Sequence, residues 1–186
     1  MSNPWKLALI LAAVSACVVN AQTPTEGHTT KVSYVNTYFN FAYTWPAMLK
    51  PSSLPSPGAN GTAYEFPLFI AREVGQPYGV VIVAQKLGVA GPHSTPLTKS
   101  GDLIDRIAHS LRPGPILSNI TRSEKKNQRG MVFDELRYLQ SGKPSSVIAT
   151  QVGEYLIVFK CNARSGAEIR AMEDSVWTLS RNRKAN

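Results

Sequence analysis

The sequence has few cysteines, the residues whose disulfide bonds stabilise many small domains. It has two cysteines among 186 residues, Cys17 and Cys161, in opposite halves of the chain. Cleavage of the N-terminal segment described below leaves Cys161 either alone or accompanied only by an acylated Cys17. A disulfide framework is therefore excluded, and the stability of the fold must come from its hydrophobic core.

The sequence also has little of what catalysis usually requires. Its three histidines, His28, His93 and His109, are isolated from one another, which argues against a metal site. Ser94 follows His93, but the G-x-S-x-G pattern of a hydrolase nucleophile is missing, as is a glycine-rich phosphate loop. We therefore expect no catalytic residue, no cofactor and no metal ligand.

Two pairs of polar residues are candidates for a catalytic pair. Asp105 precedes His109 by four residues, a spacing that favours an interaction on one helix over a catalytic dyad. Asp134 and Glu135 are adjacent in an expected strand, where neighbouring side chains point to opposite faces. They are therefore not expected to act together as acid and base on one substrate.

A single long apolar run occurs, from Leu7 to Val19, directly after Lys6. A basic start, an apolar stretch and small residues before a cut are typical of a secretory signal peptide. The run is shorter than the roughly 20 residues of a membrane span. We therefore predict a signal peptide at residues 1–21, a flexible lead at 22–29 and an exported chain, periplasmic or secreted.

Two cleavage sites compete in this segment. Cleavage between Ala21 and Gln22 releases a free chain and is the preferred interpretation. The string "VSAC", ending at Cys17, resembles a bacterial lipobox, in which the cysteine is acylated and the protein becomes a membrane-anchored lipoprotein. Val18 and Val19 continue the apolar run past the cysteine, where a lipoprotein usually turns polar at once.

The charge is positive, +8 at pH 7 with neutral histidines. Export argues against a nucleic-acid partner, and a membrane is expected as a partner only if Cys17 is acylated. Basic residues cluster at residues 122–129 and 181–184, which we interpret first as solvated turns and tails. The alternative is contact with an anionic surface, lipid headgroups or cell-wall polymer, through Arg122, Lys125, Lys126 and Arg129.

Residue periodicity predicts the secondary structure. The sequence indicates strands at about residues 31–35, 38–45, 62–70, 78–85, 116–120, 131–139, 146–152 and 155–161, helices at 100–111 and 165–179, and a Pro/Ser/Gly-rich loop at 50–61. Pro67 predicts a bulged or edge strand, because it lacks a backbone donor. Ser100 and Ser165 are expected to cap the two helices, and Gly153 and Glu154 to form the loop of the last hairpin. Most connections are too short for parallel crossovers. We expect one domain, residues 30–186, of class α+β: a mainly antiparallel sheet of about six to eight strands flanked by two main helices.

Aromatic residues concentrate in "YFNFAYTWP", residues 38–46. Phe39, Phe41, Tyr43 and Trp45 alternate with other residues, the period of a strand with one buried face. Burying four such side chains contributes roughly 6–12 kcal/mol of transfer free energy, at about 1.5–3 kcal/mol each. The stretch therefore predicts a core strand, and its aromatics do not indicate a binding platform.

The same stretch carries a family resemblance. The N-terminal phrase, with Tyr34, Asn36, Phe39, Asn40, Phe41, Ala42, Tyr43 and Pro46, resembles the "Y-N-x-x-F-G-F-S-Y-x-x-P" of the PsbP/Mog/LpqN-like fold. The closing hairpin and helix, residues 145–179, are similar too. Asn40 replaces the usual glycine, and asparagine is among the few residues that tolerate a left-handed backbone. The resemblance implies an α/β/α sandwich that binds or assembles and does not usually catalyse.

These observations lead to a functional hypothesis. We expect an exported, non-enzymatic binding or assembly module of the bacterial cell envelope, with an envelope protein or ligand as its partner. A carrier of a small molecule or lipid, with a cleft beside the 50–61 loop, is the first alternative. An exported hydrolase that uses His93, Ser94 and His109 is the least favoured.

Overall fold

The computed structural model describes residues 23–54, 65–90, 95–111, 114 and 116–181. The expected signal peptide, the cleavage site at Ala21 and Gln22, Cys17, His93 and Ser94 lie outside the described residues. Most of the 50–61 loop does so as well.

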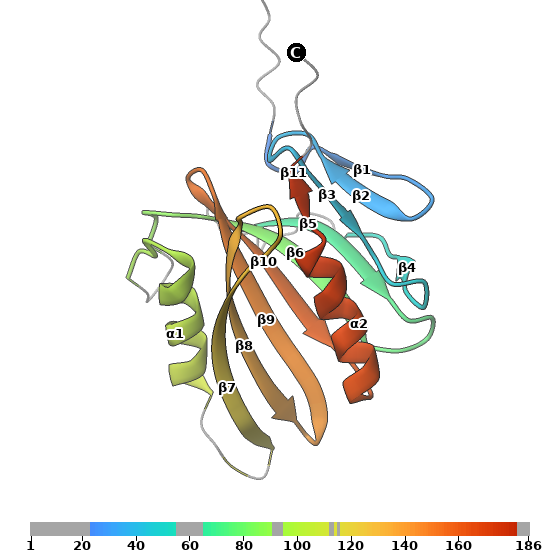
Figure 1. Cartoon of the computed structure of the whole chain (residues 1–186), viewed down its shortest axis with the longest axis vertical. Helices are drawn as coiled ribbons and strands as arrows, with labels where there is room; N and C mark the ends of the chain where they lie inside the picture. Colours follow the sequence, from blue (N-terminus) through green and yellow to red (C-terminus); the bar gives the residue numbers. More distant parts are fainter. Residues whose placement is uncertain (1–22, 55–64, 91–94, 112–113, 115, 182–186) are drawn as a thin grey trace, which may run out of the picture.

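A seven-stranded antiparallel sheet forms the body of the molecule (Figure 1). Its strands, in spatial order, are β4 (Lys50–Pro51), β5 (Glu65–Arg72), β6 (Gly79–Lys86), β10 (Tyr155–Asn162), β9 (Lys143–Val152), β8 (Val132–Gln140) and β7 (Leu117–Lys126). Helix α1 (Ser100–Ser110) packs on one face and helix α2 (Gly166–Trp177) on the other. The predicted α+β class, with an antiparallel sheet and two main helices, is confirmed.

A smaller sheet lies on the same face as α2. It contains, in order, β1 (Gly27–Thr29), β2 (Ser33–Asn36), β3 (Phe41–Thr44) and β11 (Ser180–Arg181). Its aromatic side chains join the core beneath α2, whereas a second core lies beneath α1. Strand β6 serves both cores, with Ile82 in the first and Val83 in the second. This explains its continuous apolar run, which is typical of a strand covered on both faces.

The aromatic stretch buries its alternate residues as predicted. Phe39, Phe41, Tyr43 and Trp45 are between 0% and 7% exposed. The predicted strand boundary was wrong, because β3 begins at Phe41 and the residues before it form a turn. The physical reason is Asn40, whose φ of 54° interrupts the extended backbone.

Asn36 explains the spacing of the N-terminal phrase in physical terms. Its side chain is fully buried, and Oδ1 accepts a hydrogen bond of 2.9 Å from the backbone N–H of Phe39. Nδ2 donates to the hydroxyl of Tyr34 and to the carbonyl of Pro24, both at 2.9 Å. The phrase therefore builds the β2–β3 turn and fastens the preceding segment to it.

The sequence predicted a flexible lead at residues 22–29, but part of the described stretch 23–29 forms a strand. Residues Gly27–Thr29 form β1 and pair with β2. The Tyr34 ring fills the space next to Gly27, where a Cβ would lie 2.2 Å from the phenol oxygen. Side-chain periodicity could not reveal this strand, because all its residues are exposed and its pairing is made by the backbone.

Asn40 offers a direct test of the turn geometry. Asn40→Gly is expected to keep or slightly raise the free energy of unfolding, because glycine adopts positive φ without a steric penalty. Asn40→Val is expected to lower it by about 1–2 kcal/mol, since a β-branched residue is strained there. Chemical denaturation measures both values. Equal stability of the two variants would contradict the proposed role of the left-handed backbone.

The ends of the two helices differ in how well the sequence predicted them. The hydroxyl of Ser165 accepts a hydrogen bond from the N–H of Glu168, as the predicted cap of α2 requires. Ser100 does not cap α1 as expected, because its hydroxyl donates to the Asp134 carboxylate. The Asp102 carboxylate instead accepts hydrogen bonds from the Thr98 hydroxyl and from the backbone N–H groups of residues 98 and 99, and these hydrogen bonds lower its pKa.

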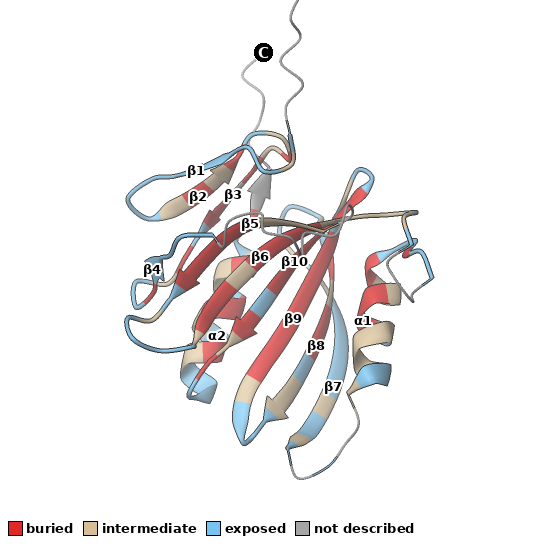
Figure 2. Cartoon of the chain, turned by 180° about the vertical axis from the view of Figure 1, so that it is seen from behind, coloured by how far each residue is buried: buried red, intermediate tan, exposed pale blue. Residues whose placement is uncertain are grey.

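Two further local predictions are confirmed. The β9–β10 hairpin turns at Gly153, whose φ is 60°, and β5 contains a bulge next to Pro67. Figure 2 shows that β6, β9 and β10 are largely buried, whereas the edge strand β7 is mostly exposed. Neither described helix is long and apolar enough to cross a membrane.

Candidate functional site

Four charged residues gather beneath α2 at the β7 side of the sheet. Lys125 comes from β7, Glu135 and Arg137 from β8, and Glu173 from α2; we call them the α2 charge cluster. Glu135 and Arg137 are two residues apart on one strand and therefore face the same side. Charged side chains at this depth are uncommon unless they are paired.

Each carboxylate of the cluster is held by a cation. Arg137 donates from Nε to Glu173 Oε1 at 3.0 Å and makes a second hydrogen bond from Nη2 to Oε2. Lys125 Nζ lies 3.1 Å from Glu135 Oε2, which also accepts a hydrogen bond from the Ser123 hydroxyl. Arg137 Nε lies 3.1 Å from Glu135 Oε1 without the alignment of a hydrogen bond.

Burial sets the electrostatics of this region. The side chains of Glu135 and Glu173 are 1% and 2% exposed, and that of Arg137 is 44% exposed. Burial raises the pKa of Glu173, although hydrogen bonds from Arg137 act in the opposite direction. Burial also raises the pKa of the neighbouring Cys161 thiol to about 12, so the thiol stays protonated at neutral pH.

This arrangement can hold a helix in place. Two carboxylates and two cations balance in charge, and the bidentate Arg137–Glu173 pair joins α2 to β8. General acid–base chemistry needs a group within hydrogen-bond reach of a substrate. Both carboxylates are instead enclosed by their own partners, which favours a structural role for the cluster.

Sequence reasoning missed this cluster, although one signal was present. The apolar face of α2 comprises Ile169, Met172 and Val176, and Glu173 lies four residues after Ile169, on the same face. A charge at a core-facing helical position requires a buried partner. The partner, Arg137, is 36 residues away in the sequence, so only the tertiary structure identifies it.

The structure separates the four residues predicted to contact an anionic surface. Arg122 forms an ion pair with Asp105 of α1, on the opposite face of β7 from Lys125. Lys126 and Arg129 are exposed near the β7–β8 turn. The interpretation of residues 122–129 as a solvated turn was wrong for residues 122–126, because these belong to strand β7. Contact of the four residues with an anionic surface stays a prediction.

The two candidate catalytic pairs, Asp105 with His109 and Asp134 with Glu135, are also separated. Asp105 pairs with Arg122 and not with His109, which is exposed in the last turn of α1. Asp134 accepts a hydrogen bond from Ser100, whereas Glu135 accepts one from Ser123. Asp134 and Glu135 therefore face opposite sides of the sheet, as predicted.

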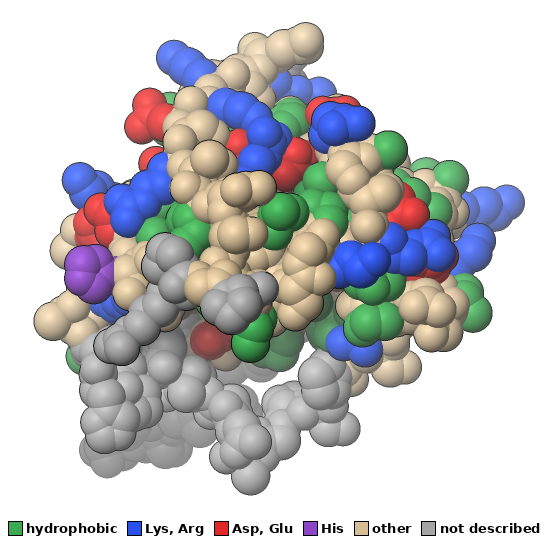
Figure 3. Space-filling model, turned by 90° about the horizontal axis from the view of Figure 1, so that it is seen from below, with side chains coloured by type: hydrophobic (Ala, Val, Ile, Leu, Met, Phe, Trp, Pro, Cys, Tyr) green, Lys and Arg blue, Asp and Glu red, His purple; other side chains and the backbone are tan. Residues whose placement is uncertain are grey.

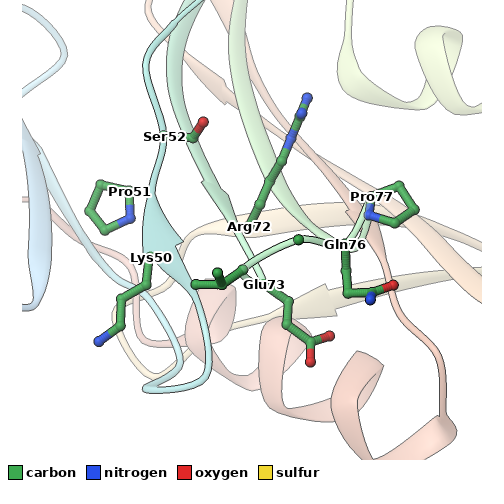
Figure 4. Close-up of a pocket in the computed structure, with 9 residues that line it drawn as sticks. Lys50, Pro51, Ser52, Arg72, Glu73, Gln76 and Pro77 are labelled. Atoms are coloured by element: carbon green, nitrogen blue, oxygen red, sulfur yellow. The ribbon is translucent and has the colours of Figure 1, made fainter.

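An open depression of about 470 Å³ lies next to the expected 50–61 loop. Lys50–Ser52 and the turn that joins β5 to β6 line it. Its charged side chains do not converge: Figure 4 shows Arg72 and Glu73 pointing in opposite directions. Glu73 is paired with Arg164 at 2.8 Å.

Figure 3, which views the molecule from below, shows basic side chains scattered among acidic and apolar ones.

Comparisons with known proteins place this architecture in one fold class. No protein-family model and no curated protein sequence matches the chain. Among solved structures, the chain is similar to the solution structure of PsbP (CyanoP) from the cyanobacterium Synechocystis sp. PCC 6803. The TM-score is 0.52 and the identity is 12%, over 80% of this chain and 91% of that one. The chain therefore has a PsbP-like α+β fold, as its N-terminal phrase predicted.

Proposed function

We propose that this protein is a non-enzymatic binding or assembly module that acts after export to the cell envelope. The observation that carries the proposal is the PsbP-like fold, which spans most of the chain and of its structural neighbour. The N-terminal resemblance implies the same class of role.

The α2 charge cluster supports this proposal over a hydrolase. Its two buried carboxylates are engaged by Lys125 and Arg137 and keep α2 on the sheet. A rigid scaffold of this kind presents its exposed loops to a partner. The carrier alternative has less support, because the depression at Lys50 is open and the charged side chains of Arg72 and Glu73 point apart.

Site-specific photo-crosslinking in cells tests the proposal. A photoreactive amino acid is placed, one at a time, at Val32, Val74 and Ile116, which are 59%, 78% and 62% exposed. These side chains lie on separate connections of the fold and contribute little to the core. A module that binds one partner is expected to yield a discrete adduct from one position, identified by mass spectrometry.

Two outcomes of the same experiment would contradict the proposal. Adducts of equal yield from all three positions indicate nonspecific contact, and no adduct from any position indicates that this surface meets no protein partner. Either outcome removes the support for a binding module. A probe at buried Ile148, which cannot reach a partner, provides the background level.

A further inference from the structure

Strand β7 forms one edge of the seven-stranded sheet. It pairs with β8 on one side, and no other described strand pairs with it. Most of its ten side chains are exposed, and Figure 2 shows it next to β8 at the border of the sheet. An unpaired edge of this length offers a row of backbone N–H and C=O groups to another strand.

The register of β7 and β8 identifies the backbone groups that point outward. The N–H of Asn127 donates to the Met131 carbonyl at 3.0 Å, and the two strands pair without interruption from Thr121 to Lys126. Because hydrogen-bonded residues alternate in an antiparallel pair, residues 121, 123 and 125 bond to β8. Residues 122, 124 and 126 therefore direct their backbone groups away from the sheet.

The three outward residues also carry charges of alternating sign on one face. Arg122 forms an ion pair with Asp105 of α1, so Glu124 and Lys126 lie on the α1 face as well. All three are exposed, and neither Glu124 nor Lys126 forms an ion pair with another described residue. Charged side chains commonly protect an edge strand from pairing. Here their order, basic–acidic–basic, makes the edge complementary to itself.

The stretch from Thr121 to Lys126 allows two extended registers with the same stretch of a second copy. In an antiparallel pair, outward residues must face outward residues, and only two such registers place five residues opposite one another. In one, Arg122 faces Lys126 of the copy and Glu124 faces itself, so like charges meet and destabilise the pair. In the other, Arg122 faces Glu124 of the copy twice, and Ser123 faces itself.

We infer that the β7 edge pairs antiparallel with the β7 edge of a second copy, with Ser123 at the two-fold axis. The large sheets of the two copies then form one continuous sheet, and Arg122 lies between its own Asp105 and Glu124 of the copy. A strand of another protein makes no use of this self-complementary order of charges. The contact between copies is independent of the partner in the proposed function.

Helix α1 leaves room for this pairing. It packs against β8 and β9. In the dimer β8 and its copy are three strand spacings apart, roughly 14 Å. Since this exceeds the roughly 10 Å diameter of a helix, the two copies of α1 do not collide. One pair of strands buries a small area, so we expect a weak dimer whose population depends on concentration.

Charge exchange between copies tests the register. The measured quantity is the dissociation constant of the full chain, from energy transfer between donor-labelled and acceptor-labelled copies. Arg122→Glu makes both facing positions acidic, and Glu124→Arg makes both basic. Each variant alone is expected to self-associate at least about 10-fold more weakly than the unaltered chain, because like charges meet twice. A mixture of the two variants is expected to return to within about 3-fold of the unaltered value, since opposite charges meet again.

Glu154→Arg is the matched control for charge reversal. The Glu154 side chain is 61% exposed in the β9–β10 turn and lies next to Lys86, at 3.7 Å. The control changes the net charge as Glu124→Arg does, but three strands away from the β7 edge. Its dissociation constant is expected to equal that of the unaltered chain.

Cysteine cross-linking tests the position of the two-fold axis. Residues that face each other in a non-hydrogen-bonded pair have Cα atoms about 4.5 Å apart, which falls in the range of a disulfide. In a Cys17→Ser background, Ser123→Cys is therefore expected to give a disulfide-linked dimer on mild oxidation. Thr121→Cys, on the same face of β7, faces Lys125 of the copy and is expected to give little. Native Cys161 is 1% exposed and adds no background.

Four results would overturn the inference. They are a chain that stays monomeric at the highest attainable concentration, a mixture of the two charge variants that associates no better than either alone, an equal loss in the Glu154→Arg control, and equal cross-linking of Thr121→Cys and Ser123→Cys. Self-association of equal strength in every charge variant belongs to the second result and places the contact elsewhere on the chain. All replaced residues but Cys17 are exposed, and thermal unfolding verifies that each variant is folded.

Discussion

Arg137→Met is expected to destabilise the domain by about 2–4 kcal/mol at pH 7. Removing one partner of a buried ion pair costs about 3–5 kcal/mol, and the exposure of the Arg137 side chain reduces this. The substitution leaves Glu173 buried without its bidentate partner, whereas Glu135 keeps Lys125. Methionine preserves much of the side-chain volume, so the loss of charge dominates the result.

The destabilisation is expected to depend on pH in a defined direction. The pKa of Glu173 is already raised by burial, and loss of Arg137 raises it further. A carboxyl whose folded pKa exceeds its unfolded value contributes stability below the unfolded pKa and loses it as pH rises through the folded pKa. The deficit of Arg137→Met should therefore be small near pH 4 and grow toward pH 7.

Urea denaturation at pH 4 and pH 7 measures both values. Arg164→Met is the matched control, because Arg164 also pairs with two carboxylates, Glu73 and Glu168, whose side chains are 25% and 23% exposed. The control is expected to cost less than about 1 kcal/mol. A deficit for Arg137→Met that is equal at both pH values, or no larger than the control, would show that the α2 charge cluster does not hold the helix.

Phe41→Ala is expected to lower the free energy of unfolding by about 3–5 kcal/mol. Phe41 is 1% exposed and packs edge-on against Tyr34, with Phe39 stacked beside it. Alanine leaves a cavity that these rings cannot fill. For a chain of this length the melting temperature should fall by roughly 10 °C.

Tyr38→Ala is the control from the same stretch. Tyr38 is partly exposed and packs against Phe39 and Tyr155 at the border of the core. We expect it to cost about 1 kcal/mol, since its removal leaves a space that water can enter. A larger loss from Tyr38→Ala than from Phe41→Ala would contradict the assignment of the alternate aromatics to the core.

Short-range patterns account for the parts of the fold that were predicted correctly. Alternation located β3, a continuous apolar run located β6, the turn at Gly153 located the closing hairpin, and a period near 3.6 located α1 and α2. Gly153 marked a turn, because glycine adopts positive φ without a steric penalty. Each of these features depends on residues within a few positions of one another.

Other features have no local signal. Strand β1 is exposed throughout and is held by backbone pairing and by the hydrogen bond from Asn36 to Pro24. The edge position of β7 depends on the order of strands in the sheet. That order separates Arg122 from Lys125, although both belong to one basic segment.

The sequence by itself determined the two helices, the antiparallel sheet, the buried aromatic strand and the resemblance to a PsbP-like fold. Only the tertiary structure decided that Arg137 pairs with Glu173 and that Asn127 binds Leu179, across 36 and 52 residues. Periodicity reports which face of an element is buried, because burial of apolar side chains repeats with the geometry of that element. Which polar groups meet depends on strand register and helix placement, and these are set by the packing of the whole chain.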